Sequence, residues 1–240
     1  MNNYFVEQKE NNFFIFDKET SHHIINVMRG RNNDQIRCVY KGDFYLSKLL
    51  IDGKICKAEI LEKEETNNEL NVHINLIYGI PKGEKLDFVL QKTTELGVKE
   101  ITLLNSERSI VKFENSKIDS KYERFNKIIK NAAEQSKRNI IPKLNKPINI
   151  ENVPINDINI IAYEEESKNN QSTLFKTLNN ELKGKVINIV IGPEGGFSQK
   201  EVNYLVKKGY TRVSLGKRIL RSETACLDLV SKIAFMSERD

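Results

Sequence analysis

The strongest constraint on the fold is an alternation of short apolar runs with amphipathic helical patterns, which begins near residue 72 and continues almost to the end of the chain. Runs such as VHINLIYGI (72–80) and KVINIVIG (185–192) predict buried strands, and stretches such as GEKLDFVLQKTTELG (83–97) predict helices between them. Strands that alternate with helices favour a parallel sheet covered by helices on both faces, an α/β fold. The predicted strands are 72–80, 99–106, 157–163, 185–192 and 211–216, and the predicted helices are 83–97, 119–138, 171–184, 198–210 and 222–236.

The first seventy residues follow a different pattern. Short apolar runs at 11–17, 35–42, 43–53 and 54–63 are separated by Gly, Asn and Asp, and they predict the strands of a small β-barrel. A short helix ending at Gly30 is predicted between the first two runs. The stretch KEETNNEL (63–70) is polar without apolar periodicity and predicts a linker. The sequence therefore predicts a β-domain over 1–70 and an α/β domain over 71–240.

Composition narrows the class of protein only moderately. The chain has 240 residues and a net charge of +5, which is compatible with a polyanionic partner but does not establish one. Its three cysteines are far apart and its histidines lack ligand spacing, so we expect neither a disulfide framework nor a metal site. No signal peptide or membrane-spanning stretch is evident, and we expect a soluble, cytoplasmic protein.

Three loops follow predicted strands in the second half of the chain: EEESKNN (164–170), GPEGGFS (192–198) and GKRILRSE (216–223). In open α/β sheets, ligands bind beyond the carboxyl ends of the strands. In the second loop, Ser198 and Glu201 form the pattern of a capping box, so a helix is expected to begin there. The glycines of this loop therefore lie between a strand and a helix, where backbone groups can approach a ligand closely.

The second loop lacks the features of a phosphate site. Neither GxxxxGK[ST] nor GxGxxG is present. Pro193 has no backbone donor, and Glu194 places a negative charge where a phosphate would lie. A neutral or cationic ligand fits better, while a plain tight turn is equally compatible with the spacing.

The third loop is basic, with Lys217, Arg218 and Arg221 within five residues, and Ser222 is predicted to cap the helix that follows. Runs of charge are usually solvated surface. A position at the end of a strand, beside another candidate loop, favours a functional role.

These motifs together resemble a known family. IGPEGGFSQKEV (191–202), followed by LGKRILRSETA (215–225), is similar to the RsmE family of ribosomal RNA small-subunit methyltransferases, which belongs to the SPOUT class. The stretches KGEKLDFVLQKTTELGV (82–98), SERS (106–109) and AEQSKR (133–138) occur in the family's order. HHIINVMRGR (22–31) also matches, although family members more often carry Leu at the position of Met28.

The resemblance implies a fold, an activity and partners. It implies a PUA-like RNA-binding β-barrel over 1–70 and a SPOUT α/β domain over 71–240, with a deep trefoil knot and pairing into a homodimer. The implied activity is S-adenosylmethionine-dependent methylation of uridine N3 in 16S rRNA, within a small ribosomal subunit or its precursor. The implied cofactor-binding residues are Ala162, Tyr163, Glu164, Ile191, Gly192, Pro193, Glu194, Gly195, Gly196, Leu215, Gly216, Ile219, Leu220 and Arg221.

Arg221 is also the predicted catalytic residue. An arginine is always charged and planar, and it suits the negative charge that develops on the uracil carbonyls as N3 loses its proton. We identify no general base, and the role of Glu194 is open. The predicted RNA-binding residues are Arg29, Arg31, Arg108, Arg138, Lys217 and Arg218.

Two other classes of protein compete with this interpretation. One is a non-catalytic RNA-binding protein that keeps the fold, against which the intact loop motifs argue. The other is an ordinary doubly wound methyltransferase or dehydrogenase. Its glycine loop usually follows the first strand of the domain, whereas here the glycine loop comes near the end of the chain.

Overall fold

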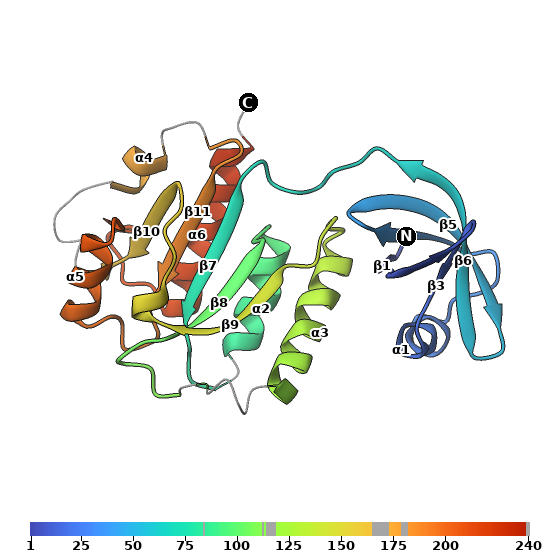
Figure 1. Ribbon diagram of the computed structural model, residues 1–240, viewed down its shortest axis with the longest axis horizontal. Helices are drawn as coiled ribbons and strands as arrows, with labels where there is room; N and C mark the ends of the chain where they lie inside the picture. Colours follow the sequence, from blue (N-terminus) through green and yellow to red (C-terminus); the bar gives the residue numbers. More distant parts are fainter. Residues whose placement is uncertain (84, 112, 114–118, 165–172, 179–181, 239–240) are drawn as a thin grey trace. The chain divides into compact units, whose positions relative to one another are not determined.

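The computed structural model describes residues 1–83, 85–111, 113, 119–164, 173–178 and 182–238. The chain divides into two compact units, which Figure 1 colours along the sequence. The first unit comprises residues 1–69 and 133–140, and the second comprises 70–132 and 141–240. The division at residue 70 lies where the sequence predicts a boundary, but residues 133–140 group with the first unit and not with the second.

The first unit is built on a six-stranded mixed sheet in the order β1-β4-β5-β6-β3-β2, in which only the β1–β4 pair is parallel. Phe14, Phe44 and Leu49 are fully buried in its core. The four predicted strands are confirmed. β1 and β2 were not predicted; the three residues of β2 are polar and exposed and carry no apolar pattern. The strands are β1 (Asn3–Phe5), β2 (Gln8–Glu10), β3 (Phe13–Ile15), β4 (Gln35–Tyr40), β5 (Asp43–Asp52) and β6 (Ile55–Glu64).

The helix predicted before Gly30 is present and begins earlier than its apolar residues suggest. α1 (Lys18–His22) is capped by the side chain of Asp17 and continues into a π-helical turn, η1 (His23–Val27). The linker begins two residues later than the predicted start at residue 63, because β6 extends to Glu64.

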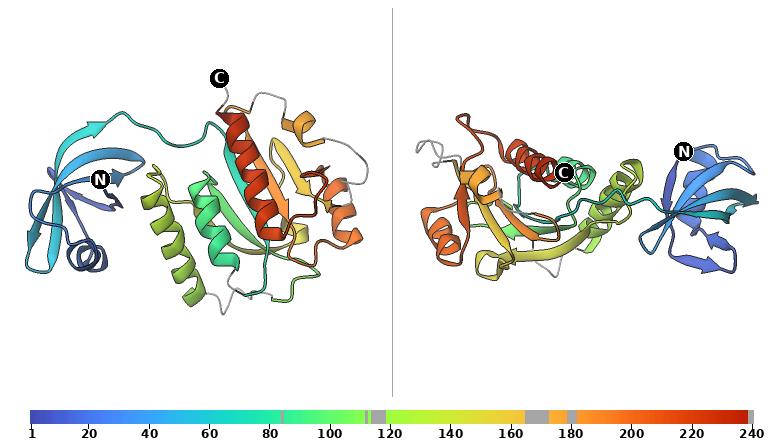
Figure 2. Two further views of the ribbon diagram at one scale, coloured as in Figure 1. Left: turned by 180° about the vertical axis from the view of Figure 1, so that it is seen from behind. Right: turned by 90° about the horizontal axis from the view of Figure 1, so that it is seen from above.

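The second unit contains a six-stranded, entirely parallel sheet in the order β12-β10-β11-β7-β8-β9, as the alternation predicts. Helices α2 and α6 cover one face and α5 covers the other, which is visible in Figure 2. The strands are β7 (His73–Gly79), β8 (Glu100–Asn105), β9 (Lys143–Asn149), β10 (Ile158–Ala162), β11 (Val186–Ile191) and β12 (Thr211–Val213). The helices are α2 (Lys85–Glu95), α3 (Asp119–Gln135), the 3₁₀ turn η3 (Ile150–Asn152), α4 (Thr173–Leu178), α5 (Gln199–Lys207) and α6 (Ser222–Ser237).

Strand β9 was not predicted. Its sequence, KLNKPIN, contains two lysines and Pro147 and lacks the apolar pattern typical of a strand. It lies at the edge of the sheet, where a proline costs no ladder hydrogen bond on its solvent side. Helices α3 and α5 each end three residues earlier than predicted, at Gln135 and Lys207. Helix α4 is described only over Thr173–Leu178, because parts of the predicted range 171–184 lie outside the described residues.

A row of asparagines fixes the register of the three central strands. Asn159, Asn188 and Asn75 lie directly beside one another on β10, β11 and β7. The Asn75 amide donates to Asn188 Oδ1 at 3.1 Å, and the Asn188 amide donates to Asn159 Oδ1 at 2.8 Å. A slip of one residue would break this row, so the carboxyl ends of these strands are held level with one another.

Of the helices that the structure describes, none combines the length and the apolar character needed to cross a bilayer.

Candidate functional site

A pocket of about 520 Å³ lies at the carboxyl ends of β10, β11 and β12. In the sheet, β10 lies between β12 and β11. The volume of the pocket is typical of sites for small molecules. The loops that line it follow these three strands, as predicted. Every residue predicted to bind the cofactor lies in the lining, from Ala162 to Arg221. Beyond Glu164, the first predicted loop (164–170) lies outside the described residues.

The glycine loop forms a tight turn that packs against the tip of β7. Gly196 donates its backbone N–H to the Pro193 carbonyl at 2.9 Å and has a φ of +66°, which favours glycine. Gly79, the last residue of β7, lies so close to Pro193 that an added Cβ would be 2.5 Å from the proline ring. The capping box is confirmed, with Ser198 and Glu201 exchanging hydrogen bonds at the start of α5. The loop therefore joins a strand to a helix with its shape fixed at both ends.

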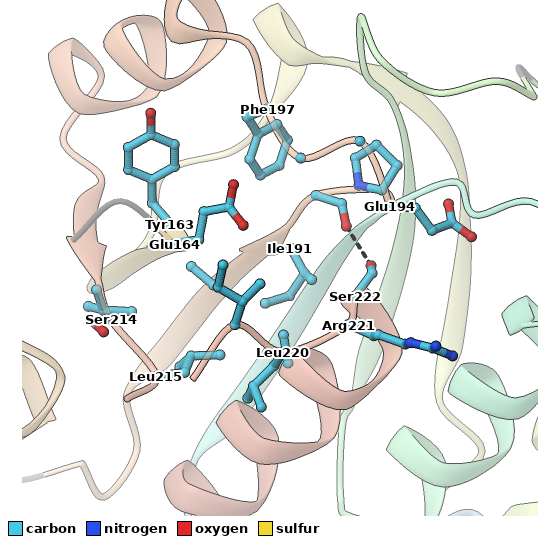
Figure 3. A pocket seen from close by; sticks show the side chains of 18 of the residues that line it. Tyr163, Glu164, Ile191, Glu194, Phe197, Ser214, Leu215, Leu220, Arg221 and Ser222 are labelled. Carbon is cyan, nitrogen blue, oxygen red and sulfur yellow. Dashed lines mark hydrogen bonds between the residues drawn. The ribbon is translucent and has the colours of Figure 1, made fainter. Parts of the chain in front are cut away.

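A buried pair of hydroxyl groups connects this loop to α6. The Ser222 hydroxyl donates to the Gly192 carbonyl at 2.5 Å, the dashed line in Figure 3. It also lies 3.1 Å from the Tyr78 hydroxyl, which is therefore the donor in that second bond. Burial raises the pKa of Tyr78, so its hydroxyl stays protonated. The prediction that Ser222 caps α6 was wrong: Arg221 is the N-cap residue, and the Ser222 side chain binds Gly192 instead.

The segment SERS (106–109) holds the glycine loop from another side. Arg108 Nη1 donates to the Gly195 carbonyl at 3.1 Å. Glu201, 5% exposed, accepts from the backbone N–H of Glu107 at 2.8 Å while its other oxygen serves the capping box. One buried carboxylate thus binds both the start of α5 and the loop after β8.

Glu194 is an ionised anchor of the turn. Its carboxylate accepts from the backbone N–H of Lys82 at 3.2 Å and lies 3.2 Å from Lys85 Nζ. Burial acts to raise the pKa of Glu194, but its own backbone N–H, Lys85 and Lys82 together lower it below the usual range. Glu194 is therefore deprotonated at neutral pH and stabilises the turn, which answers part of the question left open by the sequence.

The basic loop combines apolar and cationic side chains. Ile191, Leu215 and Leu220 form an apolar surface in Figure 3, whereas Arg221 and Glu194 extend to the side of the pocket opposite Leu215. Ile219 also lines the pocket and is 77% exposed. An apolar wall and a charged wall thus face the same space.

The residues predicted to bind RNA are divided between several places. Arg108 and Arg218 line the pocket, and Lys217 is exposed beside Arg218. Arg29 and Arg31 are exposed in the first unit, just after η1.

Arg138 differs from the other predicted RNA-binding residues. It is 3% exposed and forms an ion pair with Glu69, also in the first unit. This burial favours a structural role for Arg138 over RNA contact.

Several residues of the site were missed by sequence reasoning. Tyr78 and Lys85 precede the three loops by many residues and reach the site through the topology of the sheet, for which the sequence carries no local signal. Phe197 lies within the quoted loop and could have been found. Across the described part of the chain, no cluster of three or more His, Cys, Asp or Glu side chains could hold a metal ion.

Comparisons with known proteins agree with this geometry. A family model described as an RNA methyltransferase domain matches residues 68–234, and one described as an RNA methyltransferase PUA domain matches residues 16–61. The chain belongs to this RNA methyltransferase family. The predicted α/β and PUA-like architecture is thereby confirmed, while the trefoil knot stays a prediction.

Relatives of this methyltransferase are similar over their whole length. Ribosomal RNA small subunit methyltransferase E of Bacillus subtilis (strain 168) is 36% identical, covering 99% of this chain and 98% of its own. The protein of the same name from Mesomycoplasma hyopneumoniae (strain 232) is 37% identical, covering 97% and 98%. A crystal structure of the Neisseria gonorrhoeae protein of that name, bound to S-adenosyl methionine, has a TM-score of 0.86 at 28% identity and covers 98% of each chain.

Proposed function

We propose that this RNA methyltransferase holds S-adenosylmethionine in the pocket and methylates N3 of a uridine in 16S ribosomal RNA. The observation that carries the proposal is the convergence of the loops after β10, β11 and β12 on one pocket lined by every predicted cofactor residue. Relatives named as small-subunit methyltransferases, one of them solved with the cofactor, support the same activity.

The lining fits the chemistry of the cofactor. Ile191, Leu215 and Leu220 offer an apolar surface for an adenine ring, and the backbone of the two loops offers donors and acceptors for its edge. Ionised Glu194 and donor-free Pro193 disfavour a phosphate ligand. When bound, S-adenosylmethionine supplies an activated methyl group on a sulfonium cation.

The protein's own residues have three tasks in this reaction. The first is to accept the uracil base unpaired, since N3 is engaged when the base is in a duplex. The second is to hold N3 in line with the methyl group, which the fixed glycine loop serves. The third is to stabilise negative charge on the uracil carbonyls once the N3 proton has left, which we assign to Arg221.

RNA affinity is assigned to basic side chains on both units. Arg29 and Arg31 of the first unit and Arg108, Lys217 and Arg218 of the second are proposed to contact phosphates, so binding should weaken steeply as salt is raised. We further propose that the enzyme acts in the cytoplasm as a homodimer on the small ribosomal subunit or its precursor.

Mass spectrometry of nucleosides tests the proposal. Small subunits from cells that lack the gene are incubated with S-adenosylmethionine and either the wild-type protein or Arg221→Ala. We expect N3-methyluridine with the wild type and at least about a 100-fold slower reaction with the variant, because a donor to the developing charge is lost. Calorimetry should find that the variant still binds the cofactor.

Three results would contradict parts of this account. Absence of N3-methyluridine with the wild type would refute the activity. Unchanged turnover by Arg221→Ala would remove Arg221 from the mechanism. No cofactor binding by the wild type at millimolar concentration would favour the non-catalytic RNA-binding protein.

A further inference from the structure

The ammonium of Lys85 faces two carboxylates at the pocket. Lys85 is the first residue of α2 and lines the pocket. Its ammonium lies 3.2 Å from Glu194 Oε1 in the glycine loop and 3.5 Å from Glu223 Oε2 in the first turn of α6. The side chain is 35% exposed, so two carboxylates fix the ammonium without closing it off.

The Lys85 ammonium has more N–H donors than its two carboxylate partners require, so it can also bind a ligand. A lysine carries three N–H donors and no acceptor. Two can face Glu194 and Glu223, and the third is then available to an acceptor in the pocket. Glu223 Oε2 is buried and has no hydrogen-bond partner among the described residues, so the charge of Lys85 also compensates a buried anion.

Within this cluster Lys85 is a cation held in place and not a general base. The hydrogen bond to Glu194 raises the pKa of Lys85, burial opposes it, and the charges of Glu194 and Glu223 raise it further. The pKa of Glu194 is lowered in turn. The other charged side chains in the lining are Arg108, Arg218, Arg221 and Glu164. At neutral pH the ammonium can therefore donate a hydrogen bond but cannot remove a proton.

Arg221 is the N-cap residue of α6, next to the helix turn that carries Glu223. Glu194 and Arg221 extend to the same side of the pocket in Figure 3. Glu223 follows Arg221 by two residues at the start of α6. Of the two residues that hold Lys85, Glu194 thus extends to the same side of the pocket as the proposed catalytic arginine, and Glu223 belongs to the helix that this arginine caps.

We propose that Lys85 is a second catalytic cation, which donates a hydrogen bond to a uracil carbonyl beside N3. The proposal rests on the proposed function. Uracil carries a carbonyl on each side of N3. When the N3–H bond breaks and the proton leaves to water, the negative charge is shared by those two oxygens. An ammonium already held by two carboxylates can stabilise that charge without reorganising, which is what lowers a barrier most effectively.

The test compares Lys85→Met with Lys82→Met, a matched control. Lys82 is an exposed lysine three residues earlier that contributes only its backbone N–H to Glu194. Methylation is measured at saturating cofactor and subunits, and cofactor Kd is measured by calorimetry. We expect Lys85→Met to lower kcat by about 100-fold or more, with cofactor Kd within about 2-fold of the wild type. Lys82→Met should match the wild type in both.

A second variant separates catalysis from charge balance. Lys85→Met leaves Glu223 without its cation and could unfold the chain, so Lys85→Met/Glu223→Gln is measured with it. The double variant should recover the melting temperature and remain slow. Recovery of its activity would overturn the proposal, because Lys85 would then only neutralise Glu223.

Three further outcomes also decide against the proposal. A kcat for Lys85→Met within about 3-fold of the wild type would exclude a catalytic donor. If Lys85→Met weakens cofactor binding and leaves kcat unchanged, Lys85 binds the cofactor and does not act in catalysis. If the wild type in the same assay makes no N3-methyluridine, the proposed function fails first, and the role of Lys85 fails with it.

Discussion

The two best-described loops of the pocket are held in different ways. The glycine loop (192–198) is fastened by Ser222, Arg108 and Lys85 and rests on Gly79. Fewer hydrogen bonds are described for residues 214–221, which include the cations of the basic loop. Lys232 donates to the Leu215 carbonyl, and Ser214 exchanges hydrogen bonds with Gly216, two residues away. One wall of the pocket is thus shaped before a ligand arrives, while the other presents exposed side chains to it.

This difference has a physical basis. Binding sites hold ligands well when their polar groups need not be reorganised, and the glycine loop achieves this with side chains from elsewhere in the chain. The basic loop carries Lys217, Arg218 and Ile219 at the surface, where they are accessible to a large partner such as RNA. Substitutions of the groups that fasten the glycine loop should therefore weaken cofactor binding, and substitutions of the exposed cations of the second loop should weaken RNA binding. Leu215 and Leu220 of the second loop line the cofactor pocket.

The largest effect is expected from Gly79→Ala. An added methyl group would lie 2.5 Å from Pro193, so the glycine loop must shift. Overpacking of this kind costs about 1–3 kcal/mol, which corresponds to roughly 5- to 150-fold weaker cofactor binding if the cost falls on the loop. Calorimetry gives the affinity, and a melting curve shows whether the whole fold is affected. Unchanged affinity would mean that contact with β7 does not shape the pocket.

Ser222→Ala should have an intermediate effect. It leaves the Gly192 carbonyl without its donor and Tyr78 without its acceptor, and a buried unsatisfied group costs about 1–3 kcal/mol. Cofactor Kd should rise by about 10-fold, whereas Ser222→Thr, which keeps the hydroxyl, should stay near the wild type. Equal affinities for the alanine and threonine variants would contradict a role for this hydroxyl.

The smallest effects on cofactor affinity are expected from two substitutions that each remove one positive charge. Comparing them tests most sharply whether the two loops differ in function. Arg108→Met loses an exposed hydrogen bond to Gly195, worth about 0.5–1.5 kcal/mol, and should weaken the cofactor a few-fold. Lys217→Met removes the same charge from the basic loop and should leave cofactor affinity unchanged while reducing the salt dependence of RNA binding. If both variants weaken the cofactor alike, the two loops do not divide their tasks in this way.

Much of the fold could be predicted because its signals are local. The alternation after residue 72 identified a parallel sheet, and the rule that ligands bind at strand ends selected the three loops that line the pocket. Strand β9 could not be recognised, since an edge strand tolerates Pro147 and lysines that a central strand would exclude.

The residues that hold the glycine loop in place could not be predicted, because they lie far from it in the sequence. Tyr78 and Lys85 belong to β7 and α2, and only the sheet order places β7 beside β11, the strand that leads into the glycine loop. Ser222 has the residue type of a helix cap, but its hydroxyl donates to the Gly192 carbonyl, and Arg221 occupies the N-cap position. The sequence alone suggests that Arg138 is an exposed basic residue, because its ion pair with Glu69 joins residues far apart in the chain.

Hydrogen exchange followed by mass spectrometry, with and without S-adenosylmethionine, tests the central claim most directly. The account predicts slow exchange of the buried, hydrogen-bonded amides around the glycine loop in the free protein, and cofactor-dependent protection over 162–164, 191–197 and 214–221. The strongest change should occur in 214–221. Protection that falls elsewhere, or a glycine loop that exchanges as fast as the basic loop without cofactor, would contradict a pocket with one preformed wall.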